Sequence, residues 1–565
     1  MYNLLKHTHR PEFDPFAKKE DKLYAKDLIT LHTDPVSAQW EIYINGDVTA
    51  GMDFDLLFEF LDELAEQSRS RKKSQFAKDS TRLIIFADRL TILQLMIEDC
   101  CNVQFTARFD AHINHDIIFE ITTDKIQFRN WEALANDRVQ NLRVLYPGLR
   151  DCEVMAEAIK SFASPAYKVR YSLAHMTQKE FYAPILGQVR SERGCTNWES
   201  IDCFENANRG SRAGLYARFS SESEMCWKLH RNVQSFDKKS AYPSIFVNND
   251  HFPLGKCAQH RSRKLEWLDR CLERDEWFKI VIRTDFPFTS LMQTWKTTGE
   301  NSYGLEYYDY LSLVYLGLEG RFRSWLFNHD AEWVILTSES TGYLSDSFRR
   351  RIVELYDLKN TIDDKTDPLR RKYKTMIDMI FGKGIQRRNY TSLSELNDYF
   401  YHHSDVVLMP HQSMHAISAV KYELLWLNSF AREGDVIAYD TDGIKYADGA
   451  DTSHIDELNA RIIEQNARAG FSGSDIGLWA HEYTAPRFVQ FKTKCYAYDD
   501  GRKIHWKIAG VHKQELDRFL SEVQGDPLDF VMENGAVFTV PSNYIYDSKN
   551  HIYLPTSNEY VLRKG

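Results

Sequence analysis

We predict an α/β region followed by a longer mixed α+β region in this chain of 565 residues. Two strand-like runs, WEIYING (40–46) and RLIIFA (82–87), flank FDLLFEFLDELAEQ (54–67), whose apolar residues recur at helical spacing. The basic segment SRSRKKS (68–74) lacks apolar residues, which predicts an exposed loop. At about 150 residues per domain, this length predicts three or four domains.

The composition is typical of a soluble globular protein, with 43% apolar and 27% charged residues. The net charge of −10 does not favour nucleic-acid binding by the chain as a whole, although it leaves room for a local basic channel. No run approaches the roughly 18 apolar residues of a membrane span, and the N-terminus lacks the apolar core of a signal peptide. The nine cysteines are scattered without a CxxC pair, which predicts reduced thiols in a cytoplasm and no structural zinc site.

A basic segment at 348–388 predicts two helices joined by a polar turn at 361–368. It holds 12 Lys and Arg residues against 6 Asp and Glu residues, in a chain that is acidic overall. A run of charge usually marks only a solvated face. The two acidic motifs on either side of this run make it an exception.

The acidic motifs are QSFDKKSAYPSIF (234–246), with Asp237, and VIAYDTDGIKY (436–446), with Asp440 and Asp442. Residues two apart in a strand share a face, so we expect the last two carboxylates to lie together at a hairpin tip. Asp237 on a neighbouring strand would complete an oxygen site for Mg²⁺, and two such ions clamp the oxygens of a phosphoryl displacement. Alone, the tetrapeptide DTDG is more typical of a simple turn.

Three segments, in this order, resemble motifs of family B DNA polymerases. FDKKSAYPSI (236–245) resembles D-x-x-S-L-Y-P, KTMIDMIFGK (374–383) resembles K-x-x-x-N-S-x-Y-G, and YDTDG (439–443) resembles Y-x-D-T-D-S. LWAHEYTAPRFVQFKTKCYAY (478–498), with a K-x-Y motif, and WKIAGVHK (506–513) are similar to the protein-primed polymerases of bacteriophages. The resemblance covers nearly the whole chain.

This resemblance implies an α/β N-terminal exonuclease-like domain and an α+β right-hand polymerase of palm, fingers and thumb with two insertions. The implied boundaries are 1–170 for the exonuclease-like domain, 171–248 and 412–513 for the two parts of the palm, 249–347 for an insertion that contacts a terminal protein, 348–383 for the fingers, 384–411 for a second insertion and 514–565 for the thumb.

The resemblance also implies roles for single residues. Catalysis falls to Asp237, Asp440 and Asp442, with Asp237 and Asp442 as ligands of two Mg²⁺ ions, for which Mn²⁺ can substitute. The implied nucleotide-binding residues are Ser240, Tyr242, Lys359, Arg370, Lys374 and Phe381. The implied DNA-binding residues are Arg212, Gly214, Thr441, Lys494 and Tyr496.

In these implied roles, Tyr242 supports the incoming sugar and leaves no room for a 2′-hydroxyl. Lys374 grips the triphosphate, and Arg370 lies one helical turn before it. The chain departs from the family at Asp378, where Asn is usual, and at Gly443, where Ser is usual. Asp378 adds a negative charge near a triphosphate. Smaller departures are Ala241 for Leu and Phe381 for Tyr.

For residues 1–170 the resemblance implies a 3′–5′ exonuclease origin, with about four carboxylates around two metal ions. The matching positions have lost most of their acids. Asp27 is present but Ile29 replaces Glu, Asp88 stands in an Asn place and Ile92 replaces Asp, and Asp151 survives without its Tyr. We therefore predict a scaffold without proofreading. DFD (53–55) predicts a helix start with capping acids instead of a metal site.

The leading hypothesis is a DNA-directed DNA polymerase that starts on a protein hydroxyl and lacks proofreading. Its expected partners are primer-template DNA, deoxynucleoside triphosphates and a terminal protein, in the cytoplasm of a host cell if the protein is viral. One alternative is a specialised or template-independent polymerase in repair or antiviral defence. Another is an inactive DNA-binding scaffold.

Overall fold

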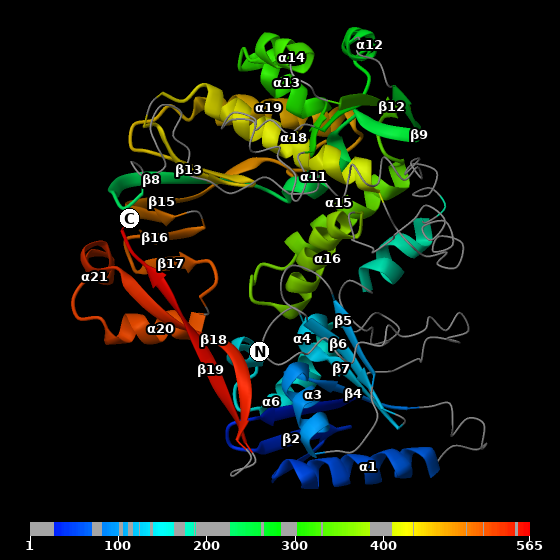
Figure 1. Cartoon of the computed structure of the whole chain (residues 1–565), viewed down its shortest axis with the longest axis vertical. Helices are drawn as coiled ribbons and strands as arrows, with labels where there is room; N and C mark the ends of the chain where they lie inside the picture. The colour runs from blue at the N-terminus through cyan, green and yellow to red at the C-terminus, as the bar shows by residue number, and fades with distance from the viewer. Residues whose placement is uncertain are drawn as a thin grey trace. The chain divides into compact units, whose positions relative to one another are not determined.

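The computed structural model describes a chain that divides into two compact units (Figure 1). The first unit comprises Met1–Glu180, Leu358–Met379 and Pro541–Ser557, and the second comprises Phe181–Asp357, Ile380–Val540 and Asn558–Gly565. The described residues are 28–70, 82–100, 106–110, 117–123, 125–135, 139–162, 176–185, 187, 226–260, 265–283, 302–328, 332–384, 409–432, 434–492, 494–511, 513–547 and 552–564.

The first unit contains a seven-stranded sheet of order β3-β2-β1-β4-β7-β6-β5. Strand β1 runs parallel to β4 and β4 parallel to β7, whereas the outer pairs are antiparallel. The strands are β1 (Ile29–Asp34), β2 (Gln39–Ile44), β3 (Asp47–Met52), β4 (Leu83–Ala87), β5 (Thr106–Asp110), β6 (Ile117–Thr122) and β7 (Ile126–Asn130). The helices are α1 (Phe54–Ser70), α3 (Leu90–Cys100), α4 (Trp131–Ala135), α5 (Val139–Leu142) and α6 (Asp151–Phe162).

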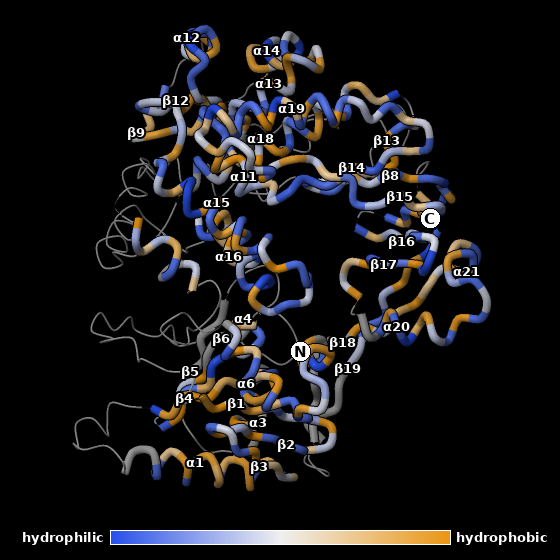
Figure 2. The backbone as a smooth tube through the Cα atoms, turned by 180° about the vertical axis from the view of Figure 1, so that it is seen from behind, coloured by the Kyte–Doolittle hydropathy of each residue, from blue (hydrophilic) through white to orange (hydrophobic). Residues whose placement is uncertain are grey.

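These elements confirm the strands predicted around 40–46 and 82–87 and the helix predicted at 54–67. Helix α1 continues to Ser70, so the loop predicted from 68 is wrong for its first three residues. Hydrophobic residues recur along this helix (Figure 2). The predicted helix start at DFD is confirmed, because the Asp53 carboxylate accepts a hydrogen bond of 2.9 Å from the Asp55 N–H.

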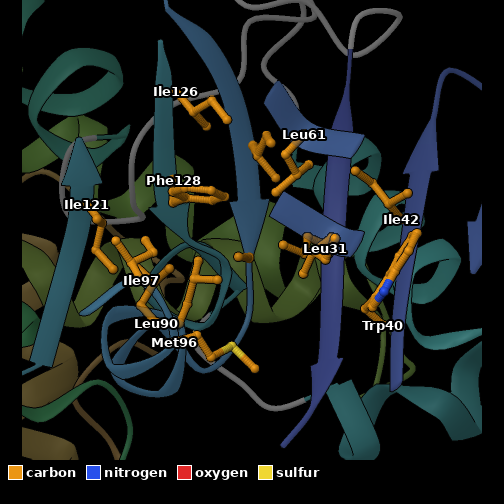
Figure 3. Packing of buried hydrophobic residues seen from close by; sticks show 14 of the residues in the cluster. Leu31, Trp40, Ile42, Leu61, Leu90, Met96, Ile97, Ile121, Ile126 and Phe128 are labelled. Atoms are coloured by element: carbon orange, nitrogen blue, oxygen red, sulfur yellow. The ribbon is translucent and has the colours of Figure 1, made fainter. Parts of the chain in front are cut away.

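The core of this sheet lies under α1 and α3 (Figure 3). Leu31 and Ile42 of the sheet, Leu61 of α1 and Leu93 of α3 are all fully buried in one cluster. Burial of each such side chain stabilises the fold by about 1.5–3 kcal/mol. Helix α6 packs on β1, where the Thr30 hydroxyl donates to the Cys152 carbonyl oxygen at 2.6 Å.

The second unit contains a six-stranded antiparallel sheet of order β13-β14-β8-β15-β16-β17. Helices α18 and α19 cover one face of it, where Phe236 and Trp479 pack against Leu424 and Ile462 (Figure 1). The strands are β8 (Leu229–Lys238), β13 (Val436–Asp440), β14 (Gly443–Tyr446), β15 (Trp479–Lys492), β16 (Cys495–Asp499) and β17 (Ile504–Ile508). The helices are α11 (Ala241–Asn248), α18 (Pro410–Ser429) and α19 (Ser453–Arg468).

A separate four-stranded sheet, of order β11-β10-β12-β9, lies between β8 and β13 in the sequence. A buried polar network ties it to α18, since His415 places Nδ1 2.6 Å from Glu306 and Nε2 2.8 Å from the Asn249 side-chain oxygen. The elements are β9 (Phe252–His260), α12 (Glu266–Arg274), β10 (Phe278–Arg283), β11 (Ser302–Glu306), α13 (Tyr307–Tyr315), α14 (Glu319–Asn328) and β12 (Glu332–Gly342).

The two helices predicted at 348–388 are confirmed as α15 (Asp346–Asn360) and α16 (Pro368–Gly384), joined by the predicted polar turn. The C-terminal elements are α20 (Lys513–Glu522), α21 (Pro527–Asn534), β18 (Ala536–Asp547) and β19 (Ile552–Leu562). Asp526 caps α21 by accepting from the Leu528 N–H at 2.9 Å. None of the helices in the described part of the chain combines the length and apolar character that a membrane span requires.

Candidate active site

Asp237 lies near the end of β8, opposite Gly443 of β14 and Ala480 of β15. Its neighbour Phe236 packs under α18 and α19, so alternation along the strand turns Asp237 to the other face of the sheet. A Cβ atom on Gly443 would lie 3.2 Å from Asp237 Oδ1. Glycine at 443, one of the departures from the family pattern, therefore leaves space beside this carboxylate.

The DTDG segment forms the turn between β13 and β14. Strand β13 ends at Asp440, and Thr441 has a left-handed φ of 61°. The predicted strand alternation of Asp440 and Asp442 is therefore wrong, because Asp442 belongs to the turn. The Asp442 carbonyl oxygen accepts from the Lys238 N–H at 2.8 Å, which holds the turn against the end of β8.

Asp442 lies close enough to Asp237 for its negative charge to change the pKa of Asp237. Burial raises the pKa of Asp237 to about 7, and the charges of Asp442 and Glu482 raise it in the same direction. Asp440 lies differently, with Oδ1 3.9 Å from Lys494 Nζ. Two carboxylates that disfavour each other's charge suit a hard divalent cation, and Mg²⁺ needs only one or two of them beside phosphate oxygens and water. No three acidic, His or Cys side chains in the described residues form a cage for a metal ion by themselves.

Glu482 is an acid that the sequence reasoning missed. It lies at a register shift of β15 between His481 and Tyr483, and the Ser235 hydroxyl donates to its Oε2 at 3.2 Å. An extra residue in one strand redirects the side chains around it, which is why such bulges recur beside active sites. Strand alternation does not find Glu482, because the bulge interrupts it. The resemblance at 478–498 covered this segment without giving Glu482 a role.

Lys494 and Tyr496 lie on the same part of the sheet. Lys494 is exposed, with a left-handed φ of 61°, just before β16. The Tyr496 ring has Lys445 Nζ at 4.9 Å and Lys507 Nζ at 5.5 Å from its centroid. These amines also lower the pKa of Asp237, so two lysines and an aromatic ring lie beside its carboxylate.

Tyr242 and Phe381 form an aromatic pair. Their ring centroids are 4.3 Å apart with an angle of 20° between planes, and both residues pack against the cluster of Met414 and Ile417 in α18. Tyr242 follows the first residue of α11, and Ser240 precedes that helix with a left-handed φ of 49°. The tight turn between Asp237 and α11 therefore sets the position of the Tyr242 ring.

The basic residues of α15 and α16 lie in two environments. Arg370 Nη1 donates to the Lys359 carbonyl oxygen at 2.9 Å, so its guanidinium closes the end of α15. Lys374 is exposed. Its positive charge and that of Lys359 interact with the carboxylate of Asp378, which lies one helical turn after Lys374. The Asp378 side chain is exposed, but neighbouring protein atoms displace part of the water around its carboxylate, which raises its pKa, and the two amines oppose that rise. The hydrogen bonds thus give Arg370 a structural contact that the motif did not suggest. Arg212 and Gly214 lie outside the described residues.

The first unit holds a different acidic cluster. Asp88 directly follows β4 and Asp151 opens α6, and both carboxylates are buried. His32 lies between them, with Nδ1 2.7 Å from Asp88 Oδ2 and Nε2 3.1 Å from Asp151 Oδ2. Burial lowers the pKa of His32, but Asp88 and Asp151 outweigh this, so the pKa is raised. Arg143 donates two hydrogen bonds of 2.5 Å to Asp151.

The sequence reasoning missed His32 and placed Ile29 at the corresponding position of the first strand. Ile29 and Ile92 instead lie in the apolar core, and the residue of β1 that meets Asp88 and Asp151 is His32. Asp27 lies outside the described residues. A histidine three residues from the expected acid breaks the motif spacing, so no local pattern indicated it.

Comparison with known proteins supports the fold. No protein-family model and no curated protein matches the chain. Phi29 DNA polymerase complexed with primer-template DNA matches with a TM-score of 0.65 and 13% identity, over 95% of this chain and all of that one. The complex of the same polymerase with incoming nucleotide substrates gives 0.64 and 11%, and an orthorhombic crystal form gives 0.62 and 13%, both over the same shares of the chains. The chain therefore has a fold similar to that of Phi29 DNA polymerase.

Proposed function

We propose that the chain is a DNA-directed DNA polymerase that adds deoxynucleotides by two-metal phosphoryl transfer. The observation that carries this proposal is the convergence of Asp237 and Asp442 at the end of β8, in a chain with a Phi29 polymerase fold. Phi29 polymerase was solved with primer-template DNA and incoming nucleotides, and we propose the same partners here.

Asp237 and Asp442 are the proposed ligands of Mg²⁺ or Mn²⁺. Bound there, the metal ions neutralise the triphosphate and lower the pKa of the attacking hydroxyl. The two carboxylates fit this task because the charge of Asp442 raises the pKa of Asp237, a cost that a cation between them would remove. Asp440, which Lys494 partly balances, is the proposed supporting acid of the turn.

The remaining residues bind and orient the substrates in this proposal. The sugar and the nascent base pair rest against the stacked rings of Tyr242 and Phe381. Exposed Lys374 attracts the triphosphate, with Lys359 nearby, while Arg370 stiffens the end of α15. Lys494, Tyr496 and Thr441 contact the primer strand, and Ser240 fixes the turn before Tyr242. Backbone contacts of this kind position DNA without reading its sequence.

We further propose that synthesis starts on a hydroxyl of a terminal protein. Support comes from the K-x-Y motif at 494–496 and from the four-stranded sheet inserted between β8 and β13. We also propose that the first unit does not proofread, because Ile29 and Ile92 are core residues and His32 lies between the remaining acids.

Primer extension tests the proposal. We expect the wild-type protein with Mg²⁺ to copy a long template from an oligonucleotide primer, and the Asp237→Asn variant to bind the same DNA without extending it. Short or template-independent products would favour a specialised polymerase instead, and no products under any condition would favour an inactive scaffold. Nucleotide bound to a candidate terminal protein, stable to acid, tests protein priming separately.

A second candidate function is an error-tolerant polymerase in repair or defence. It is favoured by Asp378, whose negative charge lies near Lys374 and weakens the attraction of that lysine for a triphosphate. The frequency of mismatched incorporation on a defined template distinguishes it from a replicative enzyme.

A further inference from the structure

The acidic cluster of the first unit lies where the fold places ligands. His32 follows Leu31, which pairs with Ala87 in the parallel register of β1 and β4, and the Asp88 N–H donates to the Leu31 carbonyl oxygen at 3.3 Å. The carboxyl ends of adjacent parallel strands are a common binding position. An exonuclease of this fold class would hold its metal ions among carboxylates here.

The contacts of His32 define its role. Both ring nitrogens face a carboxylate oxygen, at 2.7 Å and 3.1 Å. The contact with Asp88 is a hydrogen bond and the contact with Asp151 is an ion pair. A carboxylate only accepts hydrogen bonds, so the two carboxylates together favour the ring form that carries a proton on each nitrogen and a positive charge. The exposed fractions are 12% for His32, 3% for Asp88 and 5% for Asp151, so solvent screens this charge little.

Further charges complete a balanced set. Arg143 bonds Asp151 through two nitrogens, and Arg89 Nε lies 3.9 Å from Asp88 Oδ2. Glu41 of β2 is the register partner of His32 and acts electrostatically on Arg143. Asp88 Oδ1 is the one carboxylate oxygen of the Asp88–Asp151 pair without a hydrogen-bond partner in the described part of the chain.

We propose that His32 and Arg143 are built-in cations that replace divalent metal ions between Asp88 and Asp151. This inference rests on the proposed absence of proofreading and supplies its cause. A buried carboxylate pair is costly unless opposite charges compensate it, and the side chains of this chain provide that compensation. A divalent ion approaching Asp88 would meet the positive charges of His32 and Arg89, which repel it.

Counting bound Mn²⁺ by electron paramagnetic resonance tests the proposal on the full-length protein. We expect Asp88→Asn to bind as many ions as the wild type, and His32→Glu, which replaces the built-in cation by a carboxylate, to bind one more. Arg82→Glu is the matched control, because Arg82 is exposed on the same unit, donates to the Thr123 carbonyl oxygen at 2.8 Å and should gain no ion. Loss of one ion in Asp88→Asn, or no gain in a folded His32→Glu, would overturn the proposal.

A second measurement needs no variant. Hydrogen exchange in β1 and α6 of the wild type should be the same in EDTA and in Mn²⁺, whereas protection that rises with Mn²⁺ would show that the cluster binds a cation. In EDTA, His32→Gln should lower the midpoint of thermal unfolding by about 10 °C, because it leaves two buried carboxylates less compensated. An unchanged midpoint would contradict the proposed role of His32.

These outcomes are separate from the outcome for polymerase activity. Primer extension should be the same in the wild type, His32→Gln and Arg82→Glu. If none of the three extends a primer, the proposed function fails, but the counts of Mn²⁺ and the exchange data still decide the role of His32.

Discussion

Two acidic sites in this chain resemble each other in position and differ in charge. In each, one aspartate lies at or just after the end of a strand and a second comes from the segment that meets it: Asp237 with Asp442, and Asp88 with Asp151. The first pair lies beside a third acid, Glu482, and the pKa of Asp237 rises to about 7. The second pair has His32 between its carboxylates and Arg143 bonded to one of them.

The difference shows how neighbouring charges leave one carboxylate pair uncompensated, as a cation site requires, and compensate the other. Lys445 and Lys507 lower the pKa of Asp237 without preventing its rise, so the charge of that pair remains uncompensated. His32 and Arg143 make direct contacts with short distances, so the charge of their pair is balanced within the protein. The same residue type at a strand end thus has opposite proposed roles, which the charges of its neighbours decide.

We expect the largest effect from a substitution in the uncompensated pair of Asp237 and Asp442. We expect Asp442→Asn to reduce nucleotide incorporation by more than about 10³-fold, because the variant loses one of two proposed metal ligands. Asp448→Asn is the matched control, since Asp448 is an exposed acid beyond the other end of the same hairpin, bonded to Asn232 at 3.0 Å. Single-turnover incorporation with Mg²⁺ measures both. Incorporation within tenfold of the wild type in Asp442→Asn would remove it from the metal site.

The next effect concerns the aromatic pair beside the first site. Tyr242→Val removes the ring that stacks on Phe381 at 4.3 Å, so a 2′-hydroxyl gains space. We expect the ratio of ribonucleotide to deoxynucleotide incorporation to rise at least about tenfold, equivalent to about 1.4 kcal/mol. The ratio of kcat/KM values on one template measures it, and Tyr498→Val, in β16 of the six-stranded sheet, is the control. An unchanged ratio would give Tyr242 a purely structural role.

Local patterns in the sequence predicted which segments form helices and strands, and which acids cluster at the proposed active site, better than they predicted the geometry of that site. Hydrophobic spacing located α1, β2 and β4, and the motif order singled out Asp237 and Asp442. The turn at Asp442, the bulge at Glu482 and the bridge at His32 depend on strand register and long-range pairing. Spacing along the chain carries no information on such contacts. For the same reason the motif suggested nucleotide binding for Arg370 but not its hydrogen bond to the end of α15.

A smaller effect concerns charge near the proposed triphosphate site. Asp378→Asn removes an acid near Lys374 and Lys359, which leaves both amines more attractive to phosphate. Because these side chains are open to solvent, we expect KM for deoxynucleotides to fall only about two- to fivefold, with little change in kcat. Steady-state kinetics at constant ionic strength measure it. A higher KM would instead mean that Asp378 orders Lys374, and Asp363→Asn on the preceding turn serves as the control.

The smallest effect sharpens the comparison, because a second histidine lies between two aspartates in an exposed setting. His251 places Nδ1 2.7 Å from Asp250 and Nε2 2.9 Å from Asp275, whose side chains are 45% and 69% exposed. Burial lowers the pKa of His251, but hydrogen bonds to both aspartates raise it above its usual value. The stabilisation is therefore complete below the unfolded pKa of about 6.5 and disappears as pH rises through the folded pKa.

Solvent screening limits this contribution to about 0.5–1 kcal/mol, so His251→Gln should unfold slightly below the wild type at pH 5.5 and together with it at pH 9. Thermal unfolding over this pH range, monitored by circular dichroism, measures the difference, and His454→Gln, whose single ion pair with Glu457 spans 3.5 Å, is the control. A difference that grows towards high pH would mean that neutral His251 is the stabilising form. If the buried pair around His32 gives a drop several times larger on the same His→Gln change, burial rather than the bridging geometry sets the strength of such a built-in cation.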